Sequence, residues 1–195
     1  MAECSFSPAE RAFLLHLARE AAAAVLSGKS RRPTAEERAK FPRLWERRAC
    51  FTTFKRRDGE LRGCLGTLEA RAPLAEEVAR LAAETVTEDP RFYAQPVTAD
   101  ELPQLVLDVS VLHPSRPLRN PLDLELGADG ITVEGKGSFA GLRGAYLPQV
   151  ATEHHMAKEE FLNSCCAHKA SLPEDAWRDP KQCVVRAFRA EVLSE

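Results

Sequence analysis

The sequence predicts an α+β fold, mainly an antiparallel sheet flanked by helices. Asp58-Gly59 lies between two segments with alternating apolar residues, 49–55 and 61–69, which indicates a β-hairpin. Segments with helical periodicity precede and follow this hairpin, and further strand patterns come later in the chain. Strands grouped in hairpins with helices between them favour α+β over a doubly wound parallel sheet.

The first helix has a clear start signal, because Ser7 and Glu10 have the spacing of a capping box and Pro8 takes the first helical position. Its apolar stripe ends at Gly28. The polar segment 29–42 is expected to be a loop or a short helix capped by Thr34. The remaining expected elements are a helix opened by Pro73, a helix around 158–168, strands at 105–112, 130–134 and 183–193, and a glycine-rich stretch at 135–144.

The length of 195 residues fits one domain, 1–195, or two interlocked lobes. Hydrophobic residues make up 44% and charged residues 29%, which is typical of globular proteins. No apolar run approaches the roughly 20 residues that cross a bilayer, and Glu3, Glu10 and Arg11 interrupt any secretory pattern at the start. We therefore expect a cytoplasmic protein without a membrane partner.

The six cysteines, at positions 4, 50, 64, 165, 166 and 183, include no CxxC pair. Structural zinc sites and iron–sulfur sites need close, repeated thiolate ligands, so we expect no metal and no cofactor. In a reducing compartment the expected state is six free thiols, most of them buried.

Charge is unevenly distributed along the chain. Residues 29–62 contain 12 Lys/Arg against five Asp/Glu, whereas the whole chain has a net charge of −2. A basic surface of this kind attracts phosphates or nucleic acid. The alternative is an ordinary solvated surface, and the pI of about 6.2 makes nucleic acid the less expected partner.

The hairpin suggests a functional site. With Asp58-Gly59 as a two-residue loop, Lys55 faces Arg62 and Thr53 faces Cys64. Like charges directly opposite each other are destabilising, so we expect a counter-charge. An anionic small-molecule ligand or a carboxylate, either Asp89 or Glu69, would supply it.

Cys64 is the expected catalytic residue, because neighbouring cations favour the nucleophilic thiolate. Gly63 and Gly66 open access to the backbone and to the thiol, and Phe51 is expected to cover the gap at Gly66. The alternative is a bulged strand whose glycines serve packing and whose cysteine is inert. No general base can be assigned from the sequence; His113 is one option.

Motifs along nearly the whole chain resemble one known family. Leu61-Arg62-Gly63-Cys64-Leu65-Gly66 is similar to the LRGCIG signature of the AMMECR-type domain family, also called AmmeMemoRadiSam system protein A. Further matching segments are Asp58-Gly59-Glu60, Glu88-Asp89-Pro90-Arg91-Phe92, Glu101-Leu102, Ser110-Val111-Leu112, Asp129-Gly130, Leu147-Pro148-Gln149-Val150-Ala151, Glu160-Phe161-Leu162, Lys169-Ala170, Leu172-Pro173 and Trp177. Leu65 replaces the usual isoleucine and Ser171 the usual glycine, and neither change removes a side chain that could do chemistry.

The resemblance implies an α+β protein of two lobes with a cleft at the LRGCLG segment. It implies an association with a Memo-like protein and a radical-SAM protein, and it implies no particular reaction. The expected binding residues are Lys55, Arg62, Gly63, Gly66, Glu69, Asp89 and Arg91. Two hypotheses follow: a cysteine-dependent enzyme or enzyme subunit that acts on an anionic small molecule, or a non-catalytic module that binds protein or nucleic acid.

Overall fold

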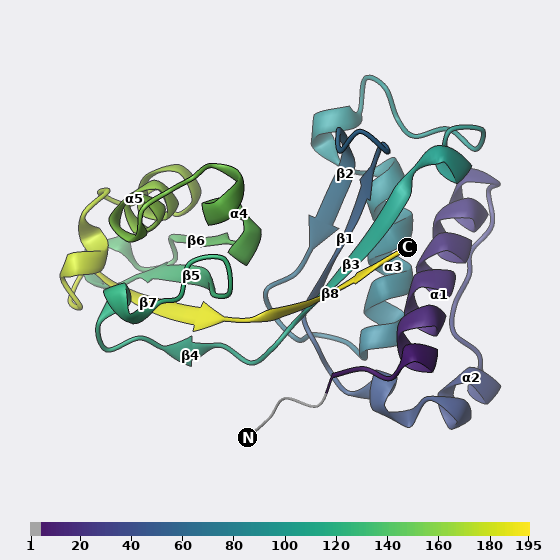
Figure 1. Ribbon diagram of the computed structural model, residues 1–195, viewed down its shortest axis with the longest axis horizontal. Coiled ribbons are helices and arrows are strands. Elements are labelled where there is room, and N and C mark those ends of the chain that lie inside the picture. The colour runs from purple at the N-terminus through teal and green to yellow at the C-terminus, as the bar shows by residue number, and fades with distance from the viewer. Residues whose placement is uncertain (1–4) are drawn as a thin grey trace. The chain divides into compact units, whose positions relative to one another are not determined.

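The computed structural model describes residues 5–195, so Cys4 lies outside the described residues (Figure 1). The helices are α1 (Pro8–Leu26), α2 (Ala35–Lys40), α3 (Leu74–Thr87), α4 (Pro148–Glu153) and α5 (Lys158–Ser164). The strands are β1 (Cys50–Lys55), β2 (Leu61–Gly66), β3 (Val106–Leu112), β4 (Arg116–Pro117), β5 (Gly130–Gly135), β6 (Arg143–Tyr146), β7 (Cys183–Phe188) and β8 (Ala190–Ser194).

The expected α+β class is confirmed. The strands form two four-stranded sheets, with order β2-β1-β3-β8 in one and β4-β7-β5-β6 in the other, and the pairings described are antiparallel. The chain divides into two compact units: residues 1–112 with 191–195 form unit 1, and residues 113–190 form unit 2. The cleft expected at the LRGCLG segment stays a prediction.

Unit 1 places two helices against its sheet, and both begin where the sequence indicates. Ser7 Oγ accepts the N–H of Glu10 while the Glu10 carboxylate accepts the N–H of Ser7 at 2.8 Å, which is the expected capping box. α1 packs on α3, and α3 packs on β1 and β2 (Figure 1). Fully buried leucines such as Leu14 and Leu74 lie in this core, and burial of each contributes about 1.5–3 kcal/mol.

The segment between α1 and β1 also follows its sequence signals. Thr34 caps α2, and its side chain accepts the N–H of Glu37 at 3.2 Å. Among the residues that the structure describes, no helix is both long enough and apolar enough to cross a membrane.

Unit 2 builds its core between the second sheet and the α5 region. α5 continues as a π-helical turn over Cys165–Lys169, and this turn packs directly on β6. A Cβ added at Gly144 of β6 would lie 2.4 Å from the carbonyl carbon of Lys169, so only glycine allows this close approach. Ser171 follows with φ 55, in the left-handed region that favours glycine, which gives a physical reason for the family's glycine at this position.

The expectation of a single closing strand over 183–193 is wrong. β7 pairs with β5 in unit 2, whereas β8 belongs to the sheet of unit 1, and the two are separated at Arg189. The Arg189 carbonyl accepts the N–H of His113 at 2.8 Å. Ala187 and Phe188 are adjacent and both buried, so the alternation of apolar residues is interrupted just before the change of sheet, a signal that the sequence analysis missed.

Candidate functional site

The hairpin of β1 and β2 has a longer loop than the sequence suggested. Arg56 and Glu60 close it by the bond from Arg56 N to Glu60 O, 2.8 Å, so residues 57–59 form a three-residue loop with Gly59 at φ 93. Lys55 consequently lies opposite Leu61, and the expected Lys55–Arg62 pairing is wrong. A bulge then adds one residue on β2, because Phe54 is already opposite Gly63.

The extra residue in the loop and the extra residue of the bulge offset each other in the register of β1 and β2. Thr53 lies opposite Cys64 and Phe51 opposite Gly66, as expected from the two-residue loop. The prediction that Cys64 shares a sheet face with Thr53 is therefore right. The prediction that Arg62 lies opposite Lys55 is wrong.

Arg62 has a counter-ion that the sequence analysis did not select. Its guanidinium makes a two-point ion pair with Glu101, with Nε–Oε1 at 2.6 Å and Nη2–Oε2 at 2.8 Å. Nη2 also donates to the Gln95 carbonyl, and the Phe92 ring lies 5.3 Å from the guanidinium carbon. The hydrogen bonds from Arg62 lower the pKa of Glu101, and those to Glu101 raise the pKa of Arg62.

The expectation that Asp89 or Glu69 neutralises Arg62 is therefore wrong. Glu69 pairs with Arg71, two residues away, at the surface. Asp89 pairs with Arg91, also two residues away, with Nη2–Oδ2 at 2.6 Å. In both cases an arginine close in sequence reaches the carboxylate more easily than Arg62 does.

Asp89 and Arg91 instead hold the backbone of Cys64. Asp89 Oδ2 accepts the Cys64 N–H at 2.8 Å, and Arg91 Nη2 donates to the Cys64 carbonyl at 2.9 Å. β2 is an edge strand of its sheet, so these two side chains supply the partners that a further strand would supply. Burial acts to raise the pKa of Asp89, but the bonds from Arg91 and from the Cys64 N–H outweigh it and lower the pKa.

Both glycines of the LRGCLG segment allow close packing. A Cβ at Gly63 would lie 2.7 Å from the backbone carbonyl oxygen of Thr85 on α3. A Cβ at Gly66 would lie 2.2 Å from the ring of Phe51, so the ring does cover this gap as expected. The glycines therefore serve packing, as the alternative hypothesis of a structural bulged strand proposed.

The Cys64 side chain lies on the sheet face opposite to α3, because Gly63 faces Thr85 and side chains alternate along β2. The Thr53 hydroxyl donates to Cys64 Sγ at 3.2 Å. Asp108 of β3 lies opposite Thr53, and its Oδ2 accepts from Lys55 Nζ at 2.6 Å. We call Cys64, Thr53, Lys55 and Asp108 the polar row.

Lys55 therefore already has a counter-ion. Asp108 is largely buried, and its Oδ1 has no hydrogen-bond partner among the described residues. A buried carboxylate oxygen without a donor is unusual in a folded protein. The polar row thus combines a partly exposed thiol, a hydroxyl, an ammonium group and an unsatisfied acceptor.

Sequence reasoning missed Glu101 and Asp108. Glu101 had only its place in a family motif to indicate a role. Asp108 had a stronger signal, because it is the one charged residue in the apolar strand β3. A charged residue inside a central strand is rarely left without a partner, and this signal could have pointed to Lys55.

The other described cysteines are buried free thiols. Burial raises the pKa of Cys165 to about 12, and burial also raises the pKa of Cys50. Among residues 5–195, Cys64 is the cysteine with a partly exposed side chain, and these residues include no group of three or more side chains that could hold a metal ion.

Comparison with known proteins places these observations in a family. The AMMECR1 family model matches residues 15–193. A protein of Thermococcus gammatolerans is 39% identical over 193 residues, which cover 94% of this chain and 89% of that protein. Protein MK0488 of Methanopyrus kandleri is 39% identical over 196 residues, which cover 95% of this chain and 88% of that protein.

A solved structure is also similar. The crystal structure of uncharacterized protein PH0010 from Pyrococcus horikoshii superimposes with a TM-score of 0.80 at 37% sequence identity. The match covers 92% of this chain and 88% of that chain.

Proposed function

This chain belongs to the AMMECR1 family, and from that premise we propose that its polar row is a small-molecule site in which Cys64 acts as a thiol nucleophile. The observation that carries the proposal is the hydrogen bond from Thr53 to Cys64 Sγ on a partly exposed sheet face. It fixes the direction of the sulfur, and nucleophilic catalysis requires such positioning.

An anionic small molecule suits the row because of Lys55. An ammonium group has three N–H donors, and the described contacts of Lys55 use one of them, for Asp108. Two donors remain for a carboxylate or phosphate group of a ligand. The Lys55 side chain is 37% exposed, so a ligand reaches it from solvent.

Limited alkylation followed by mass spectrometry tests the proposal. We expect iodoacetamide to label Cys64 before Cys50, Cys165, Cys166 and Cys183, because Cys64 is partly exposed and these four thiols are buried. Thr53→Val removes the hydroxyl and should slow labelling of Cys64 severalfold. Thr87→Val, at an exposed threonine of α3, should leave the rate unchanged. Labelling of Cys64 no faster than that of the buried cysteines would mean that Cys64 is a packed structural residue.

A non-catalytic binding module is the second candidate. It is favoured by the structural partners of the LRGCLG segment, since both glycines, Arg62 and the backbone of Cys64 each have a packing or pairing role. Cys64→Ser separates the two functions, because catalysis should collapse whereas binding should survive.

We further propose a Memo-like protein and a radical-SAM protein as partners. Co-purification of the three tagged proteins from one host, with and without Cys64→Ser, tests this association. An unchanged complex in the variant would support a docking role, and no complex with either protein would exclude both partners.

A further inference from the structure

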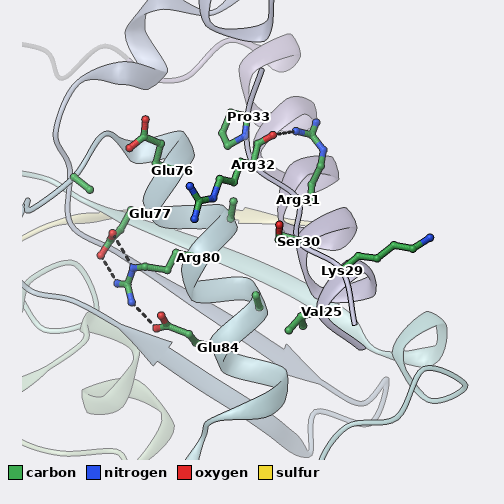
Figure 2. A pocket seen from close by; sticks show the side chains of 14 residues that line it. Val25, Lys29, Ser30, Arg31, Arg32, Pro33, Glu76, Glu77, Arg80 and Glu84 are labelled. Carbon is green, nitrogen blue, oxygen red and sulfur yellow. Dashed lines mark hydrogen bonds and ion pairs between the residues drawn. The ribbon is translucent and has the colours of Figure 1, made fainter. Parts of the chain in front are cut away.

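A cavity of about 490 Å³ lies within unit 1, away from the polar row. Its walls are the second half of α1, the segment 29–33 and α3 (Figure 2). α3 covers the sheet face opposite to Cys64, so the cavity and the polar row are on opposite sides of the sheet. This volume is within the range of about 300–1,000 Å³ that is typical of small-molecule sites.

The floor of the cavity is apolar because its side chains are small. Ala21 and Val25 of α1 face Ala79 and Ala83 of α3 across it. Short side chains at the contact of two helices leave room that leucines would fill. An occupant of this floor gains burial free energy only from an apolar group.

The charged side chains that line the cavity form its rim, and most of them are already paired with an opposite charge. Arg80 binds Glu77 with Nη2–Oε1 at 2.6 Å and also pairs with Glu84, as the dashed lines of Figure 2 show. Arg31 is held by Glu20 and Glu37 outside the cavity lining, and its hydrogen bond to Glu37 raises the pKa of Arg31.

Two rim groups of opposite charge have no ion pair or side-chain hydrogen bond within the described part of the chain: the guanidinium of Arg32 and the carboxylate of Glu76. Figure 2 shows both at the end of the cavity where Arg80 lies, whereas Lys29 extends at the other end. They come from different elements, the segment 29–33 and the first turn of α3, and both line the same cavity.

We propose that this cavity binds a free amino acid with an apolar side chain. The α-carboxylate pairs with the guanidinium of Arg32, whose planar fork matches a carboxylate at two points. The α-ammonium pairs with Glu76, and the apolar side chain covers the alanines of the floor. A purely anionic ligand fits less well, because Glu76 would repel it at the same end of the cavity.

This proposal is independent of the polar row, so each can fail without the other. The test is isothermal titration calorimetry of the full chain with L-phenylalanine. Three analogues each lack one feature: 3-phenylpropionate lacks the amine, 2-phenylethylamine lacks the carboxylate, and L-serine lacks the apolar body. Loss of one charge-assisted contact should weaken binding about tenfold or more.

Variants assign the contacts. Arg32→Gln should weaken L-phenylalanine about tenfold and leave 2-phenylethylamine unchanged, and Glu76→Gln should weaken L-phenylalanine while leaving 3-phenylpropionate unchanged. Ala83→Phe should abolish binding by filling the floor. The matched controls are Arg57→Gln and Glu88→Gln, at exposed residues of the same unit that do not line the cavity.

Four results would overturn the proposal. They are no saturable binding of L-phenylalanine, binding of L-phenylalanine no tighter than that of both monofunctional analogues, unchanged affinity in both Arg32→Gln and Glu76→Gln, or an equal loss in the control variants. Thermal unfolding of each variant verifies that it is folded, and all four exchanged charges are at exposed positions where substitution leaves the core intact.

Discussion

Asp89 and Arg91 together hold the Cys64 backbone, one at its N–H and the other at its carbonyl, and we call this pair the clamp. Replacing Asp89 with asparagine removes one charge and disturbs both contacts. The carboxylate accepts from the Cys64 N–H and from three donors of Arg91, which are its backbone N–H, Nε and Nη2. An asparagine amide accepts on one side only. Its NH₂ group therefore faces either the Cys64 N–H or the Arg91 guanidinium, donor against donor.

The cost follows from the exposure of the two partners. Breaking a fully buried ion pair costs about 3–5 kcal/mol, and losing a hydrogen bond to a charged group costs about 1.5–3 kcal/mol. The Asp89 side chain is 2% exposed but Arg91 is 51% exposed, so water can rehydrate the freed guanidinium. We expect Asp89→Asn to lower the free energy of unfolding by about 2–3 kcal/mol, which corresponds to a Tm decrease of about 4–12 °C for a chain of this size.

The effect depends on pH with a defined sign. The pKa of Asp89 is lowered from 3.8 in the folded state, so its stabilisation is fully present above about pH 4. It is lost as the pH falls through the lower folded pKa. The difference between wild type and Asp89→Asn should thus be constant from pH 5 to 7 and decrease below pH 4.

Urea unfolding at several pH values measures these differences, and hydrogen exchange of the Cys64 amide reports the clamp locally. Exchange should become faster in Asp89→Asn, because the Cys64 N–H loses its acceptor. Glu88→Gln, at the neighbouring exposed carboxylate, is the control. A loss below 0.5 kcal/mol, or a loss that is the same at pH 3 and pH 7, would refute this account of the clamp.

Three further substitutions have defined outcomes. Gly63→Ala should cost about 1–3 kcal/mol in urea unfolding, because the contacting Thr85 oxygen is backbone and cannot rotate away; no loss would mean that α3 shifts freely. Glu101→Gln should cost about 1–3 kcal/mol at pH 7, since Arg62 is 7% exposed and loses its counter-ion, and the loss should disappear in an Arg62→Gln background. Ser171→Gly should raise the free energy of unfolding by about 0.5–1 kcal/mol by relieving the positive φ, and a lower Tm would contradict this.

Local signals in the sequence predicted the local structure well. The capping box at Ser7 and the cap at Thr34 depend on residues within one helical turn, so α1 and α2 begin where the pattern indicates. The face that carries Cys64 was predicted correctly from the wrong loop length, because the bulge on β2 offsets the extra loop residue.

The contacts of the site were less predictable because they depend on chain geometry between distant elements. Arg62 binds Glu101 across 39 positions, and the bulge that turns Arg62 away from Lys55 has no local sequence signature. Asp89 contacts the Cys64 backbone, but its ion-pair partner is Arg91, two residues away, and not Arg62 as we expected.

The compensation between the hairpin loop and the bulge has a consequence for comparing relatives. One additional residue in the loop is cancelled by one additional residue on β2, so the total number of residues between Thr53 and Cys64 is what an uninterrupted two-residue hairpin would have. A homologue of unchanged length that keeps this loop but loses the bulge would place Cys64 opposite Thr52 and turn the thiol toward α3. Relatives of the same length should therefore have both the three-residue loop and the bulge, or neither, and those with neither would have Arg62 opposite Lys55.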